Sequence, residues 1–234
     1  QGQTWEGSDM PNENSSTAKG TRCVALVGPQ SSGKTSLLEG MLFAAGAIAK
    51  KGSVADGSTV SDPSSEAKAR QMSTEITPVR FSYLDDNWVV LDCPGAIDLI
   101  ADAVIIVVDP DANKMLGLGA LLRLLDEHAI PHMLFINKMD TWTGSVRELL
   151  SAAQRQSSRP LILRHIPIRE NLQITGYVDL VAERAYHYKL DHPSERIPLD
   201  EAPDEAADAR RDLLEKLSDF DDALLEKLLE DIEP

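Results

Sequence analysis

The segment at positions 28–35, Gly-Pro-Gln-Ser-Ser-Gly-Lys-Thr, constrains the fold of this chain more than any other feature. It matches the P-loop pattern, in which a glycine, four residues and a second glycine precede a lysine and a serine or threonine. An unbroken apolar run at residues 23–27 leads into it, as expected of a buried parallel strand. Apolar residues at helical spacing follow it at Leu37, Leu38, Met41 and Leu42. These flanks favour a nucleotide phosphate site over a coincidental glycine-rich turn.

The chemistry of such a loop assigns roles to its residues. Backbone N–H groups turn toward a phosphate, and the positive end of the following helix adds to the attraction. We expect Lys34 to bridge the outer phosphates and the Thr35 hydroxyl to bind Mg²⁺. The predicted phosphate-binding residues are Gly28, Ser31, Ser32, Gly33, Lys34, Thr35 and Ser36.

A second motif, Asp-Cys-Pro-Gly at positions 92–95, closes an apolar run at residues 88–91. An aspartate at the end of a strand can hold Mg²⁺ through water, and Gly95 leaves room for its N–H to reach a γ-phosphate. Alone, the motif is no more than a turn signal. Because it follows a P-loop, we interpret Asp92 as a metal-binding residue and Gly95 as part of the catalytic site.

A third motif, Asn-Lys-Met-Asp at positions 137–140, ends the next apolar run at residues 133–136. A carboxylate at Asp140 can accept hydrogen bonds from guanine N1–H and its amine, whereas adenine has an acceptor at N1 and no amine. An unpaired polar group in a site costs about 1–3 kcal/mol. We expect Asn137 to brace the loop and Lys138 to lie along the base plane. The sequence therefore predicts GTP or GDP with Mg²⁺, although a polar turn is the alternative.

Strands and helices alternate along the first part of the chain. Residues 76–84 and 88–91 are expected to form a hairpin joined at 85–87, and residues 103–108 a further strand before that at 133–136. An amphipathic helix is expected between them, with Met115, Leu118, Leu121, Leu122 and Leu125 on its apolar face. This alternation predicts an α/β fold with a doubly wound, mostly parallel sheet.

The pattern of apolar and charged residues changes after about residue 159. Short strands are expected around Ile162, Ile166 and Ile168 and at residues 177–181, followed by acidic helices at about 203–217 and 221–232. We predict a disordered leader at residues 1–20, a GTP-binding domain at 21–158 and a partial, acidic α+β subdomain at 159–234. Residues 47–73 are expected to form a long loop.

The charge of the chain is unevenly distributed. Of the net charge of −15, residues 191–234 carry −11, with 16 Asp and Glu against 5 Lys and Arg. Such a surface disfavours DNA and other phosphate backbones. It is either a solvated helical face or a surface that meets a basic protein partner. No apolar run approaches the roughly 18 residues of a membrane span and no signal peptide is evident, so we expect a cytoplasmic protein without membrane contact.

Four segments resemble elongation factor G and its paralogues, which are translational GTPases: residues 46–48, 52–62, 135–140 and 175–180. The resemblance covers residues 23–234 and implies the GTPase domain with the start of its inserted subdomain. It implies GTP hydrolysis, with the ribosome as partner and activator. The family's switch threonine, which contacts Mg²⁺ and the γ-phosphate, falls on Thr74, with Thr77 as the alternative. By this resemblance Lys34, Thr74 and Gly95 are the catalytic residues.

The sequence departs from the family pattern at several positions. Ala96 replaces the histidine that positions the attacking water, and Ser31 replaces the P-loop aspartate. Residues 71–73 read Gln-Met-Ser in place of Arg-Gly-Ile, and the chain is short between Leu99 and Ala101. We therefore expect slow GTP hydrolysis. The alternative is a guanine-nucleotide-gated regulatory module that hydrolyses weakly or not at all; an ATP-using P-loop kinase is opposed by Asp140.

Overall fold

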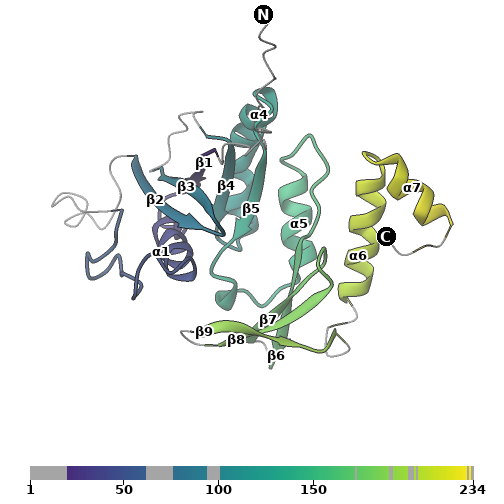
Figure 1. Cartoon of the computed structure of the whole chain (residues 1–234). Helices are drawn as coiled ribbons and strands as arrows, with labels where there is room; N and C mark the ends of the chain where they lie inside the picture. Colours follow the sequence, from purple (N-terminus) through teal and green to yellow (C-terminus); the bar gives the residue numbers. More distant parts are fainter. Residues whose placement is uncertain are drawn as a thin grey trace, which may run out of the picture.

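Figure 1 shows the computed structural model of the chain. It describes residues 20–61, 76–93, 101–171, 173–189, 192–199, 203, 205–230 and 232. Most of the predicted leader at residues 1–20 lies outside this range. So do Thr74, Gly95, Ala96 and the short stretch before Ala101. In the described part, no helix has the length and apolar character that a membrane crossing requires.

The first sheet has five strands in the order β2-β3-β1-β4-β5. Its strands are β1 (Arg22–Val27), β2 (Thr77–Tyr83), β3 (Asp86–Asp92), β4 (Ala103–Val108) and β5 (His132–Ile136). Only β2 runs antiparallel to its neighbour; β3, β1, β4 and β5 are parallel. The predicted mostly parallel α/β sheet is confirmed.

Helices cover both faces of this sheet (Figure 1). Helix α1 (Lys34–Ala44) packs Leu38 and Leu42 against Leu26, Val79 and Val90. The opposite face carries α3 (Ala112–Met115), the 3-10 turn η1 (Leu116–Leu118), α4 (Gly119–Glu127) and α5 (Val146–Gln154). Neighbouring residues of β1 enter different cores because successive strand side chains point to opposite faces.

Two local predictions need correction. The predicted single helix over residues 115–125 is interrupted by η1, and Met115 belongs to the short helix before it. The β2–β3 turn consists of Leu84 and Asp85, not residues 85–87, since Asp86 pairs with Tyr83. Both turn residues have positive φ, 49° and 63°, which is the backbone of a tight two-residue hairpin.

The second sheet is an antiparallel meander of β6 (His165–Glu170), β7 (Gln173–Asp179), β8 (Arg184–Lys189) and β9 (His192–Ile197). Helix α6 (Glu205–Ser218) covers one face through Ala206, Ala209 and Leu213, and α7 (Asp222–Leu229) contacts α6. Both acidic helices were predicted, but Ile162 lies before β6 rather than in a strand, and β8 and β9 were not predicted. Val146 of α5 packs in this second core.

Candidate nucleotide-binding site

Two glycines of the P-loop sit where no side chain fits. Gly28 directly follows β1 and has φ 142°, and a Cβ there would lie 2.1 Å from the carbonyl oxygen of Val107. Gly33 precedes α1 with φ 92°, and a Cβ there would lie 2.2 Å from Nδ2 of Asn137. At Gly28 a Cβ would collide with the backbone of β4, whereas at Gly33 the positive φ is the main obstacle to a side chain, which would also displace the amide of Asn137.

Lys34 begins α1 and folds back over the loop. Its Nζ donates hydrogen bonds to the carbonyl oxygens of Gly28 and Pro29, both at 3.1 Å. The residue is 8% exposed, and burial lowers the pKa of its ammonium group, an effect that Asp92 partly opposes. The ammonium group is thus held against the P-loop at the start of α1, where a helix N-terminus and a cation together suit an anion.

Asp92, at the end of β3, accepts hydrogen bonds from two hydroxyl groups. Oδ2 accepts hydrogen bonds from the Thr35 hydroxyl at 2.7 Å and from the Ser61 hydroxyl at 2.9 Å. The residue is completely buried, and Oδ1 accepts no hydrogen bond from any residue in the described ranges. A buried carboxylate oxygen beside a threonine hydroxyl fits a hard cation such as Mg²⁺, which takes oxygen ligands.

Ser61 reaches Asp92 because a buried carboxylate holds the preceding loop. Glu39 of α1 is 2% exposed and accepts hydrogen bonds from the backbone N–H groups of Gly52, at 2.7 Å, and Val60, at 2.6 Å. The predicted loop after α1 therefore packs onto that helix at least as far as Ser61. Sequence reasoning assigned no site role to either residue: Glu39 belongs to no motif, and Ser61 lies in the segment 52–62 that resembles the family but carries no pattern pointing to Asp92.

The third motif lies against the P-loop. Asn137 donates a hydrogen bond from Nδ2 to the Ser32 carbonyl oxygen at 2.9 Å, and Lys138 donates one from Nζ to the Ser31 carbonyl oxygen at 2.5 Å. Lys138 has φ 55°, a left-handed conformation that turns the chain into η2 (Met139–Thr141). Asp140 lies in η2 with its side chain exposed. The carboxyl ends of β1 and β5 thus bring together segments more than a hundred residues apart.

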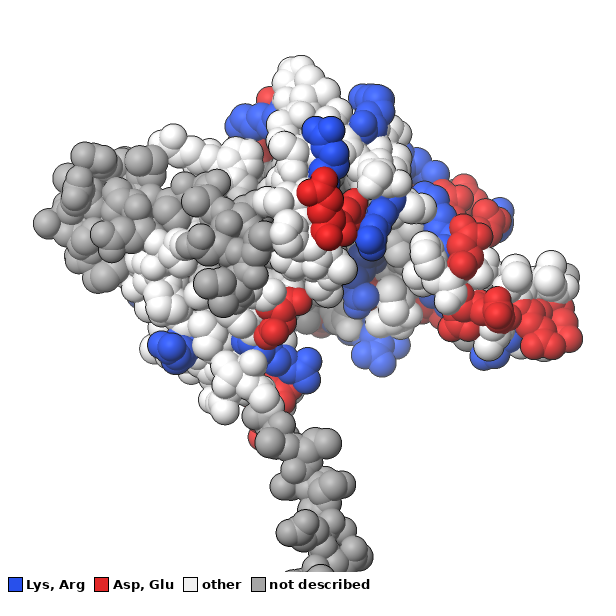
Figure 2. Space-filling model, turned by 90° about the horizontal axis from the view of Figure 1, so that it is seen from above, with Lys and Arg blue, Asp and Glu red and all other residues white. Residues whose placement is uncertain are grey.

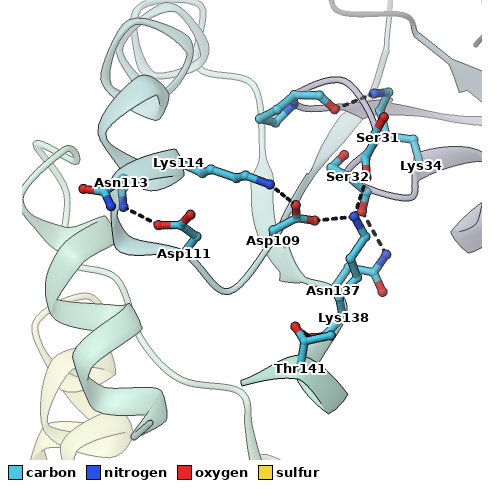
Figure 3. A network of polar contacts seen from close by, with 11 residues as sticks. Ser31, Ser32, Lys34, Asp109, Asp111, Asn113, Lys114, Asn137, Lys138 and Thr141 are labelled. Carbon is cyan, nitrogen blue, oxygen red and sulfur yellow. Dashed lines mark hydrogen bonds and ion pairs between the residues drawn. The ribbon is translucent and has the colours of Figure 1, made fainter. Parts of the chain in front are cut away.

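Asp109, which directly follows β4, is a further site residue that the sequence did not reveal (Figure 3). Lys114 of α3 donates a hydrogen bond to its Oδ2, and Nζ of Lys138 lies 3.0 Å from its Oδ1. Burial raises the pKa of this carboxyl, but the hydrogen bond from Lys114 and the contact with Lys138 outweigh it, and the pKa lies below its usual range.

Two predicted residues, Thr74 and Gly95, lie outside the described part of the chain, and their roles stay predictions. Thr77, the alternative to Thr74, opens β2 and pairs with Asp92 across the antiparallel ladder. Ser36 follows Thr35 in the first turn of α1, and its side chain is exposed.

Comparison with known proteins places this site in a family. The model of the elongation factor Tu GTP-binding domain matches residues 19–225. An elongation factor G-like protein of Synechocystis sp. (strain ATCC 27184 / PCC 6803 / Kazusa) is 44% identical, over 94% of this chain and 34% of its own length. The crystal structure of ttk003000868 from Thermus thermophilus matches with a TM-score of 0.77 and 28% identity, over 91% of this chain and 33% of that one. The chain thus spans about a third of the length of these relatives.

Proposed function

The chain belongs to the elongation factor Tu GTP-binding domain family of translational GTPases, and we propose that it binds GTP and GDP with Mg²⁺ as the nucleotide-binding part of an elongation factor G-like protein. One observation carries this proposal: Asn137 and Lys138 donate hydrogen bonds to consecutive carbonyl groups of the P-loop. A base held by residues 137–140 would therefore have its phosphates beside Lys34.

The choice of guanine rests on Asp140. Its exposed carboxylate can accept hydrogen bonds from the N1–H and amine of guanine, and adenine offers neither donor at those positions. The stem of Lys138 would lie along the base plane, and Asn137 would keep the loop closed on Ser32. Bound adenine would leave the carboxylate facing a lone pair, which is the kind of mismatch that sites built on hydrogen bonds reject strongly.

Mg²⁺ would be held by the hydroxyl of Thr35, with Asp92 acting through water and Thr74 supplied by the family pattern. When bound, the ion would neutralise the charge on the outer phosphates and draw electrons from the bond that breaks. Lys34 would bind the same phosphates, and the N–H of Gly95 would meet the γ-phosphate. Thr35 would have to turn its hydroxyl from Asp92 toward the ion.

Hydrolysis is proposed to be slow and linked to the ribosome. The family resemblance supports the ribosome as partner, and Ala96 supports the slow rate because a methyl group cannot orient or polarise water. A positioned acid–base group typically contributes about 10²–10⁴-fold to a rate. The second candidate function, a nucleotide-gated regulatory module with little hydrolysis, is favoured by the same residue.

The acidic end of the chain is proposed to meet a basic protein partner. In Figure 2 the red acidic side chains gather at the right-hand side of the molecule, where Figure 1 draws α6 and α7. The exposed acidic residues of these helices, of the turn between them and of the residue after α7 are Asp208, Asp212, Glu215, Asp219, Asp221, Asp222, Glu226 and Glu230. We also propose the domain limits 21–158 and 159–234 and a cytoplasmic location.

Calorimetry with GDP, a GTP analogue and ATP tests the proposal. We expect the two guanine nucleotides to bind in the presence of Mg²⁺ and ATP to bind far more weakly. Equal affinities for GDP and ATP would overturn it. Single-turnover hydrolysis with and without ribosomes then separates the two candidate functions: stimulated turnover supports a ribosome-linked GTPase, and its absence favours the regulatory module.

A further inference from the structure

Two lysines from different segments converge on one carboxylate at the edge of the site (Figure 3). Asp109 is 8% exposed and directly follows β4, which lies between β1 and β5 in the sheet. Lys114 reaches it from α3 and Lys138 from the loop after β5. Burying a carboxylate costs free energy unless it is paired, and here both partners are cations.

The two lysines are not equivalent. Lys114 arrives from a short helix whose first turn is capped by Asp111, which accepts a hydrogen bond from the backbone N–H of Asn113 at 2.8 Å. Lys138 has a second partner, the Ser31 carbonyl oxygen of the P-loop. Its ammonium group therefore lies between a carboxylate on one side and the phosphate loop on the other.

The Lys138 side chain depends on this arrangement for its position. Its side chain is 40% exposed, and a lysine carries a well-hydrated charge on a flexible stem of four carbons. A single hydrogen bond to a carbonyl group competes poorly with water for such a group. The side chain of Asp109, 11% exposed, adds a second attraction for the ammonium group, and so restricts where the stem can lie.

We propose that Asp109 is a positioning residue for guanine-nucleotide binding, which holds the ammonium group of Lys138 against the P-loop so that the stem of this lysine is already in place for the base. The inference rests on the proposed function, because that proposal places the stem of Lys138 along the plane of the bound base. Asp109 itself is not required to touch the nucleotide. It acts through Lys138, so removing its charge matters only while Lys138 is present.

The test is the GDP dissociation rate, followed by stopped-flow fluorescence of a labelled GDP. Asp109→Asn keeps the shape of the side chain and removes its charge, and we expect dissociation about tenfold faster, as for the loss of a charge-assisted contact. Asp111→Asn is the matched control, since an amide oxygen can still cap α3; its rate should stay within about twofold of the parent. In a Lys138→Ala background, Asp109→Asn should change the rate by less than about twofold.

The outcomes separate this inference from the proposed function. If the parent chain binds no GDP, the proposed function fails and the inference with it. If the parent binds GDP but Asp109→Asn dissociates at the same rate, only the inference fails. It also fails if Asp109→Asn has the same effect with and without Lys138, because that result indicates a general structural role. Asp109→Glu, which retains the charge, should dissociate more slowly than Asp109→Asn; equal rates for the two variants would overturn the proposal.

Discussion

Replacing Glu39 by alanine should detach the loop at residues 52–61 from helix α1. The buried carboxylate accepts two short hydrogen bonds from backbone N–H groups of that loop, at 2.7 and 2.6 Å. Each hydrogen bond to a charged group is worth about 1.5–3 kcal/mol. In the variant, water would form hydrogen bonds with the half-buried N–H groups and so replace part of the lost free energy. We therefore expect the free energy of local opening to fall by about 2–3 kcal/mol.

Hydrogen exchange with mass spectrometry measures this opening directly. Because each 1.4 kcal/mol is a factor of ten, peptides covering residues 52–61 should lose protection by about 30- to 150-fold. Peptides from β1 and α1 should exchange as in the parent chain. The Ser61 hydroxyl, which is carried by this loop, should also lose its hydrogen bond to Asp92.

Two further variants sharpen the result. Glu39→Gln has the same shape, but only its carbonyl oxygen can accept a hydrogen bond, so protection should fall by an intermediate amount. Glu127→Ala removes an exposed carboxylate from the end of α4 and should leave exchange in residues 52–61 unchanged. Unchanged protection of that loop in Glu39→Ala would refute the reasoning, since another contact would then hold it.

Three other predictions test the site and the second sheet. Lys34→Ala should abolish measurable GDP binding by calorimetry, whereas Lys50→Ala, an exposed lysine, should not; retained binding in the first variant contradicts the role of Lys34. Asp140→Asn should weaken GTP binding by about 1–3 kcal/mol and favour xanthine nucleotides in competition assays, and an unchanged preference for guanine speaks against a base-reading carboxylate. Partial burial of the His165 ring, whose side chain is still 48% exposed, lowers its pKa, with Asp179 opposing, so the unfolded chain binds this proton more readily. The free energy of unfolding should therefore fall as the pH drops through about 6.5, less so in His165→Gln; parallel profiles for the two proteins would contradict this.

Features carried by local sequence were predictable. Strands β1, β4 and β5 each contain a continuous apolar run, which is buried in β1 and β4 and half-buried in β5, and each ends at a motif or a turn where the polar residues begin. The positions of Gly28 and Gly33 followed from the P-loop pattern, and the structure gives the reason for both, since a side chain at either would collide with a neighbouring strand or loop. Periodicity likewise predicted α1, α6 and α7.

Strands β8 and β9 were not predicted because their sequences lack a run or a regular alternation of apolar residues. β8 buries only Ala185 fully, and β9 is an edge strand whose residues are all exposed or half-buried. Their pairing depends on the register that β7 imposes, with Tyr177 opposite Tyr186 and the two rings stacked 5.2 Å apart. The pairing of β8 and β9 is therefore determined by tertiary contacts and could not be predicted from their local, largely polar sequence.

The missed site residues share a physical task. Glu39 and Asp109 are carboxylates close to a site proposed to bind phosphates, where negative charge alone would oppose binding. The negative charge of each is compensated locally: Glu39 accepts hydrogen bonds from two backbone N–H groups, and Asp109 forms ion pairs with two lysines. Each also joins a separate segment to the site, the loop before Ser61 in one case and the loop of Lys138 in the other. The residue needed at such a position depends on its neighbours in space and not on its neighbours in sequence. Glu39 and Asp109 therefore belong to no sequence motif, although the site depends on the contacts they make.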